Sequence, residues 1–88
     1  MPIQTGSVVE SIAGHDAGRF YVVVSVEKRH VALADGKVRL LEKPKRKSVK
    51  HIRKTNAVLD LSSGATNKKL RTFLRGCRGE SEGGNELV

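Results

Sequence analysis

The sequence predicts a mainly all-β fold, a small barrel or sandwich, followed by one short basic helix. Three features support this prediction: short runs rich in β-branched residues, turn residues between those runs, and one apolar stripe at helical spacing near the C-terminus. With 88 residues, the chain has room for one small domain with a modest core. That core must come mainly from Val, Leu, Ile and Ala, because the chain has no Trp, one Tyr and two Phe.

The first two expected strands flank a turn that contains glycines. Residues 7–12 read SVVESI, and residues 20–27 begin with FYVVVSV, where β-branched and aromatic residues favour a strand over a helix. The unbroken apolar character of the second strand predicts burial on both faces, at the centre of a curled sheet. Gly14 and Gly18 lie too close together for a phosphate-binding P-loop, which also needs a Lys-Ser or Lys-Thr pair and a following helix.

The middle of the chain predicts a hairpin, a loop and a closing strand. In VALADGKVRLL, Asp35 and Gly36 lie between two apolar runs, which is a strong signal for a type I′ hairpin turn. We expect a loop over residues 42–48, because Pro44 argues against a central strand there. A short closing strand is expected over residues 49–52, and NAVLDL is a possible further element.

The last ordered element is expected to be an amphipathic helix with Asn67 as its N-cap. Its apolar stripe has the spacing i, i+3, i+4 and i+7 and comprises Leu70, Phe73, Leu74 and Cys77. Gly76 and Gly79 are expected to end the helix. The predicted organisation is therefore a barrel domain over residues 1–60, a linker and basic helix over 61–78, and a disordered, Gly-rich tail over 79–88.

The charge distribution points to a polyanionic partner. The net charge is +8, and twelve of the 17 Lys and Arg residues lie within residues 43–78, where Asp60 is the one acid. A concentrated basic region is the expected footprint of nucleic acid, because phosphate contacts release condensed counterions. The segment KPKRKSVKHIRK has three other readings: a solvated face, a localisation address or a patch that attracts lipids. Nucleic-acid contact is favoured, because strands on both sides would hold this segment in place.

Several other functional classes are not expected. The three histidines lack the short spacings of metal ligands, so no metal and no other cofactor is predicted. Cys77 lies in an electropositive RGCRG segment, but it completes the helix stripe, and we expect no enzyme activity. The longest apolar run, residues 20–24, is far shorter than the roughly 20 residues of a membrane helix. The single cysteine and the absence of a leader pattern predict a cytoplasmic protein.

Two stretches of the chain resemble a known family. GSVVESIAGHDAGRFYVVVSV, residues 6–26, resembles a KOW motif, two strands joined by a loop with a central glycine, here Gly14. VALADGKVRLLEKPKRKSVKHI, residues 31–52, resembles the second half of the fourteenth large-subunit ribosomal protein of the eukaryotic-type series, with a looser match in the helix from Asn67. The resemblance implies an SH3-like five-stranded barrel that binds structured RNA, ribosomal RNA in particular. Because the chain is short and has an acidic tail, a constitutive ribosomal component and a transient ribosome-associated factor both remain open.

The candidate RNA-binding residues follow from this resemblance and from the charge pattern. They comprise the loop Gly14, His15, Asp16, Gly18 and Arg19, the basic segment Lys43, Lys45, Arg46, Lys47, Lys50, His51, Arg53 and Lys54, and the helix residues Lys68, Lys69 and Arg71. We expect a monomer that binds folded RNA by shape and backbone, with no membrane and no small-molecule substrate as partner. Two alternatives are a transcription-associated KOW module that contacts polymerase and nascent RNA, and a protein-binding SH3-like module, which would need more aromatic rings.

Overall fold

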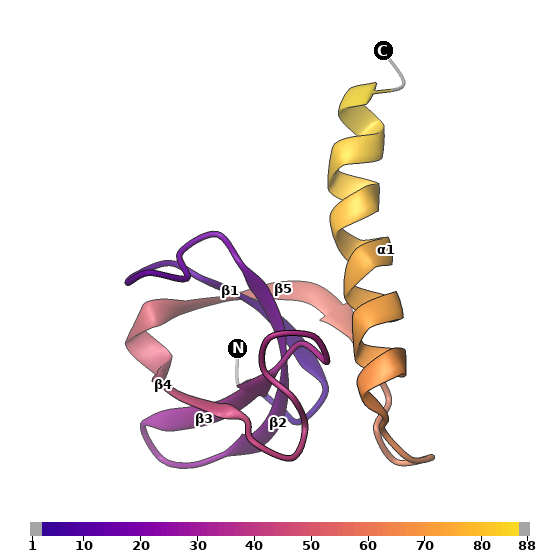
Figure 1. Cartoon of the computed structure of the whole chain (residues 1–88). Coiled ribbons are helices and arrows are strands. Elements are labelled where there is room, and N and C mark those ends of the chain that lie inside the picture. The colour runs from indigo at the N-terminus through magenta and orange to yellow at the C-terminus, as the bar shows by residue number, and fades with distance from the viewer. Residues whose placement is uncertain (1–2, 87–88) are drawn as a thin grey trace.

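The structure is a computed structural model that describes residues 3–86, with side chains described as far as Cys77. Five strands form one antiparallel sheet in the order β4-β3-β2-β1-β5, and a single α-helix packs beside it (Figure 1). The elements are β1 (Ser7–Ser11), β2 (Phe20–Val26), β3 (His30–Ala34), β4 (Lys45–Ser48), a 3₁₀-helix η1 (Val49–His51), β5 (Ile52–Val58) and α1 (Asn67–Glu86). The sheet curls into a small SH3-like barrel that is not closed, and its edge strands β4 and β5 are joined by η1. The predicted mainly all-β fold with one C-terminal helix is therefore confirmed.

The first half of the central strand β2 is buried on both faces, as its apolar run predicted, whereas Ser25 and Val26 at its end are exposed. It pairs with β1 through Val8↔Val22 and Val9↔Tyr21, so successive residues of both strands alternate between two cores. The inner core lies inside the curled sheet and comprises Val9, Tyr21, Val23, Val31, Leu33 and Ile52. The outer core lies between the other face and the helix and comprises Val8, Val22, Ala34, Leu70 and Leu74.

Two register shifts accompany the curvature of the sheet. One interrupts the β1–β5 ladder between Ser7 and Val9, and the other interrupts the β2–β3 ladder between Val23 and Ser25. Such irregularities bend a strand and increase its twist. The inner core can therefore be enclosed by a single sheet.

Helix α1 covers the outer face of the sheet through the predicted apolar stripe. Leu70 and Leu74 are buried, and Phe73 and Cys77 pack against the same outer core. The N-cap is Thr66, one residue before the predicted Asn67, because the Thr66 hydroxyl accepts from the backbone N–H of Lys69 at 3.1 Å.

The Asn67 side chain instead ties the helix to the preceding loop, and the far end of α1 also differs from prediction. The amide oxygen of Asn67 accepts from the N–H of Leu41 at 2.8 Å. The backbone of α1 continues through Gly76 and Gly79 to Glu86, so the predicted stop at these glycines is wrong. The predicted disordered tail, residues 79–88, lies outside the residues whose side chains the structure describes.

The predicted hairpin at Asp35 and Gly36 is wrong in its second strand. The Asp35 carboxylate accepts from the backbone N–H groups of Lys37, Val38 and Arg39 at 2.8–2.9 Å, which folds residues 35–39 into a tight turn. The apolar residue Leu41 then packs against the outer core instead of extending a ladder. Of the apolar residues after Gly36, Leu41 therefore supports the docking of α1, whereas Val38 and Leu40 are exposed.

The next segment also differs from prediction, because β4 occupies part of the expected loop. β4 begins at Lys45, directly after Pro44, and pairs with β3 at the edge of the sheet, where a preceding proline is tolerated. The expected closing strand over residues 49–52 is largely η1, and β5 extends from Ile52 to Val58. The possible element NAVLDL thus contributes its first three residues to β5.

Candidate nucleic-acid interface

The loop between β1 and β2, residues 12–19, is built around the carboxylate of Asp16. This side chain is 9% exposed and accepts hydrogen bonds from the Ser11 hydroxyl at 2.8 Å and the Tyr21 hydroxyl at 3.0 Å. Ser11 ends β1 and Tyr21 is the second residue of β2, so the aspartate joins the loop to both of its strands. Asp16 therefore fixes the shape of the loop.

Two lysines of β4 complete this cluster. Lys45 Nζ lies 2.9 Å from Asp16 Oδ2, and Lys47 Nζ lies 2.9 Å from Asp16 Oδ1. Lys47 is 9% exposed and also donates to the backbone carbonyl of Ala13 at 3.0 Å. Alternate residues of a strand share one face, so both lysines point toward the loop. Sequence reasoning placed Asp16, Lys45 and Lys47 among RNA contacts, whereas in the structure they bind one another.

The charge state of the cluster follows from these contacts. Burial raises the pKa of Asp16, but the hydrogen bonds from Lys47, Lys45, Ser11 and Tyr21 outweigh it and hold the pKa well below its ordinary value. Burial and the hydrogen bond to Asp16 raise the pKa of Tyr21 to about 12. At neutral pH the aspartate is therefore ionised and the phenol remains a donor.

Two other predicted residues form exposed ion pairs. Arg46 lies 3.1 Å from Glu27, with both side chains more than half exposed. Arg53 lies 2.7 Å from Glu10 across the β1–β5 ladder. Exposed ion pairs of this kind contribute between about 0 and 1 kcal/mol to the stability of the fold. Both arginines can therefore exchange their carboxylate partner for a phosphate at little cost.

The remaining predicted residues are mostly exposed but do not form one cluster. Lys50 and His51 lie in η1, on the side of the barrel away from α1 (Figure 1). Lys54 is half-buried in β5. Lys69 donates to the carbonyl of Gly64 at 2.9 Å, near the start of the helix. The other exposed members are Gly14, His15, Gly18, Arg19, Lys43, Lys68 and Arg71.

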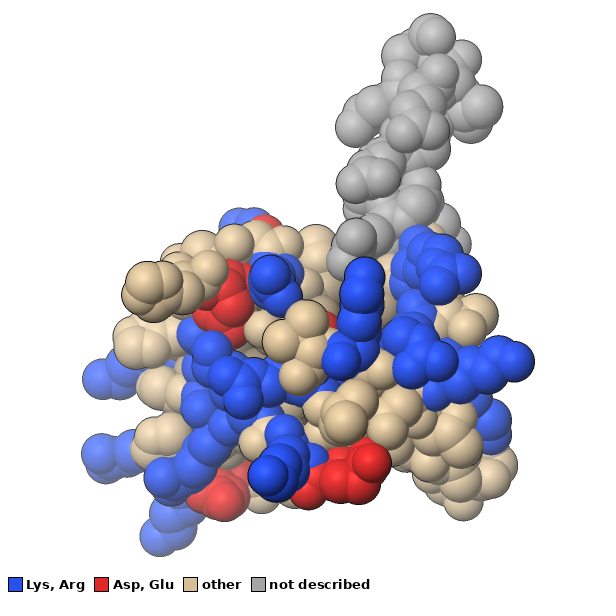
Figure 2. Space-filling view, in the orientation of Figure 1, with Lys and Arg blue, Asp and Glu red and all other residues tan. Residues whose placement is uncertain are grey.

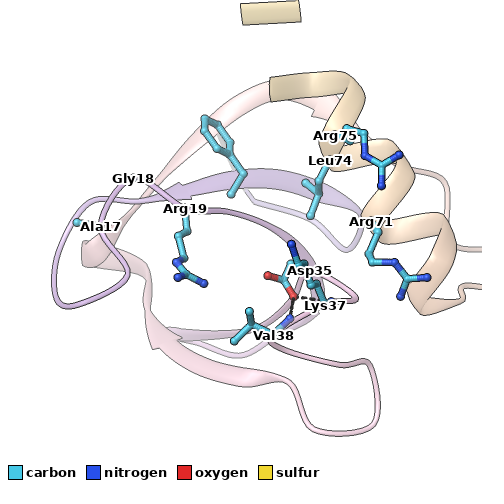
Figure 3. Close-up of a pocket in the computed structure, with 10 residues that line it drawn as sticks. Ala17, Gly18, Arg19, Asp35, Lys37, Val38, Arg71, Leu74 and Arg75 are labelled. Carbon is cyan, nitrogen blue, oxygen red and sulfur yellow. Dashed lines mark hydrogen bonds between the residues drawn. The ribbon is translucent and has the colours of Figure 1, made fainter. Parts of the chain in front are cut away.

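A groove of about 660 Å³ brings three distant segments together (Figure 3). The β1–β2 loop supplies Gly18 and Arg19, the 35–39 turn supplies Asp35, Lys37 and Val38, and α1 supplies Arg71, Leu74 and Arg75. Four of these side chains are cations and one is an acid. The Nη1 of Arg71 also donates to the carbonyl of Gly36 at 2.7 Å, which joins α1 to the turn.

Sequence reasoning missed five of the eight groove residues named above, which are Asp35, Lys37, Val38, Leu74 and Arg75. Asp35 was predicted in a hairpin turn and Leu74 in the apolar stripe of the helix, but neither was expected at a binding site. An aspartate before a glycine favours a turn in which the carboxylate accepts from the backbone N–H groups that follow it. This signal could have placed Lys37 in such a turn. The approach of α1 to the turn is a long-range contact with no local signal.

The surface around the groove is strongly basic. Figure 2 shows Lys and Arg side chains across the visible face, from the barrel to the described part of α1, with a few acidic side chains among them. Phosphates are the ligands that such a surface attracts. Within the part of the chain that the structure describes, no three His, Cys, Asp or Glu residues gather as metal ligands do. Among the described residues, no helix has the length and apolar character needed to cross a membrane.

Comparison with known proteins assigns the chain to a family. No family model matches the sequence. The chain is 33% identical over 69 residues to the large ribosomal subunit protein eL14 of Staphylothermus marinus, an alignment that covers 77% of this chain and 72% of the relative. The alignment thus extends over most of both proteins. The chain belongs to the eL14 family of large-subunit ribosomal proteins.

Proposed function

We propose that the chain acts in translation by binding structured RNA, ribosomal RNA in particular, through exposed basic side chains on a rigid barrel. One observation carries this proposal. Arg19, Lys37, Arg71 and Arg75 come from three separate segments and line one groove on a strongly basic face. The relative is named as a ribosomal protein, not an enzyme, in agreement with the prediction of no enzyme activity.

The kind of RNA follows from the aromatic side chains. Binders of single strands stack successive bases on several exposed rings. Here Tyr21 is 2% exposed and its hydroxyl is bound to Asp16, so this ring is not available. Its burial also argues against an aromatic cage for a protein ligand. Recognition of folded RNA by shape and backbone fits the described surface best, and we extend the proposal to a cytoplasmic monomer on the ribosome.

The dependence of RNA binding on salt tests this function. Replacing Lys43 and Lys68 by glutamine one at a time should lower the slope of log K against log salt by up to about one unit for each phosphate that the variant no longer binds. Both side chains are exposed, and neither makes a hydrogen bond within the described residues. The measurement is a series of titrations of a ribosomal RNA fragment at several salt concentrations.

The choice of these lysines follows from the structure. A triple replacement of Lys45, Arg46 and Lys47 by alanine would also remove the two lysine partners of Asp16. Weaker RNA binding by that variant could then result from a disturbed loop as well as from lost RNA contacts. Glu27→Gln serves as a control, because it removes an exposed charge of the opposite sign. Equal affinity for the RNA and for an uncharged polymer in moderate salt would refute the proposed function.

A further inference from the structure

The groove between the β1–β2 loop and α1 combines two kinds of surface. Its rim carries the cations Arg19, Lys37, Arg71 and Arg75 (Figure 3). Its lining also includes Phe20, Val38 and Leu74, and Val38 is 59% exposed. A groove lined by both cations and apolar side chains is suited to a ligand that has both an anion and an apolar face.

We propose that this groove holds one unpaired nucleotide, extruded from the stem of the bound RNA. This inference rests on the proposed function and specifies the RNA feature that is recognised. The base lies against Val38 and the edge of Phe20, and the flanking phosphates face the four cations. A groove of about 660 Å³ is in the range of about 300–1,000 Å³ that suits groups of this size.

A regular duplex would leave the apolar part of the lining without a contact. The phosphates of a paired stem bind cations but offer no apolar face, because their bases are stacked inside the helix. Unstacked bases, in contrast, are the usual targets of specific RNA recognition and stack on aromatic rings or on guanidinium planes. Three of the four cations of the groove are arginines.

Asp35 distinguishes a nucleotide from an acidic peptide. Its Oδ1 accepts three backbone N–H groups, and no described residue donates to its Oδ2. Figure 3 shows Asp35 between Arg19 and Arg71, at the groove. A carboxylate in this place repels acidic side chains but accepts from the N–H groups on the edge of a base. The site therefore favours a nucleobase over a peptide carboxylate.

The site is also held rigid before binding. The Asp35 carboxylate fixes the turn that carries Lys37 and Val38, and the bond from Arg71 to the Gly36 carbonyl fixes the turn to the helix. Leu70 and Leu74 anchor that part of α1 in the outer core. A preorganised groove avoids part of the ordering cost of binding.

The test compares three forms of one RNA hairpin: fully paired, with one bulged nucleotide, and with an abasic residue in the bulge. Wild-type protein should bind the bulged hairpin about tenfold more tightly than the other two, because the groove contacts one base that the paired and abasic hairpins do not offer. The groove variant Arg19→Gln/Arg75→Gln should lose this preference. The control Lys28→Gln/Arg29→Gln removes the same charge from exposed residues of the β2–β3 turn and should retain it.

Each outcome decides the inference. If the wild type binds RNA but shows no preference for the bulged hairpin, the nucleotide site is wrong while the proposed function stands. If both double variants lose the preference equally, the effect is general charge and the groove assignment fails. Tighter binding of an acidic peptide of alternating glutamate and leucine than of the bulged hairpin would also overturn it. Absence of binding to all three hairpins would refute the proposed function itself.

Discussion

Replacing Asp16 with asparagine is expected to lower the free energy of unfolding by about 3 kcal/mol, as measured by urea denaturation. The amide removes the negative charge from a cluster in which Lys45 and Lys47 each lie 2.9 Å from the carboxylate. Lys47 is 9% exposed and would be left as an uncompensated buried cation. Removing one partner of a buried ion pair costs more stability than the intact pair contributes. The reason is that the remaining charge stays buried, with neither its partner nor water to compensate it.

The same cluster predicts a dependence of stability on pH. The native pKa of Asp16 is held well below that of the unfolded chain, so the native state favours the ionised carboxylate. The ionised Asp16 therefore stabilises the native state fully when the pH is above the pKa of about 3.9 that the aspartate has in the unfolded chain. This stabilisation is lost as the pH falls from there toward the lower native pKa. The wild type should lose stability through this acid window more steeply than Asp16→Asn.

Two further variants isolate the buried charge. Asp16→Asn/Lys47→Met removes both charges, and it should recover part of the loss because no unpaired cation remains. Glu27→Gln breaks the exposed pair with Arg46 and should change stability by less than about 1 kcal/mol. Should Asp16→Asn unfold at the same urea concentration as Glu27→Gln, the cluster does not hold the loop.

Gly36→Ala is expected to lower the free energy of unfolding by about 3 kcal/mol and to displace α1 from the sheet. Gly36 has a φ of +77°, where an L side chain is strained by about 1–2 kcal/mol. In addition, the new methyl group would overlap the backbone carbonyl of Asn67, the first residue of the helix. Overpacking of this kind adds about 1–3 kcal/mol.

Gly18→Ala is the matched control for this variant. Gly18 also has a positive φ, +92°, but no atom lies within 4 Å of the position of an added Cβ. Its replacement should therefore show the backbone strain alone, about 1–2 kcal/mol. Stability is measured by urea denaturation, and displacement of the helix is measured by binding of a hydrophobic dye to the exposed outer core. If the two variants lose equal stability, the contact between the turn and the helix is unimportant.

The accuracy of the sequence predictions depended on whether the signal was local. β1, β2 and the helix stripe were predicted correctly, because alternation and helical spacing depend on residues close together in the chain. The run after Gly36 was misread as a strand, since its apolar residue Leu41 is partly buried and packs against the outer core, which includes residues of a distant helix. Pro44 was read correctly for its own position, but β4 begins at the next residue because an edge strand tolerates a proline there.

The arrangement of the candidate site was harder to predict than the fold, because it depends on contacts between residues that are far apart in the sequence. A run of lysines in a sequence predicts a basic surface, yet Lys45 and Lys47 both bind Asp16, an aspartate about thirty residues earlier, which offsets one of their two charges. The groove could not be predicted, because it forms where the β1–β2 loop, the 35–39 turn and α1 meet. Composition predicts a polyanionic partner, whereas the proposed positions of the contacts follow from the three-dimensional arrangement.

The central claim is that a rigid barrel and helix present one basic face to ribosomal RNA. Ultraviolet crosslinking in cells, followed by sequencing of the attached RNA and mass spectrometry of the attached peptides, tests it most directly. We predict fragments of large-subunit ribosomal RNA, crosslinked within residues 14–19, 37–43 and 68–75. Crosslinks to nascent messages, or crosslinks confined to the loop of residues 60–63, would contradict the account.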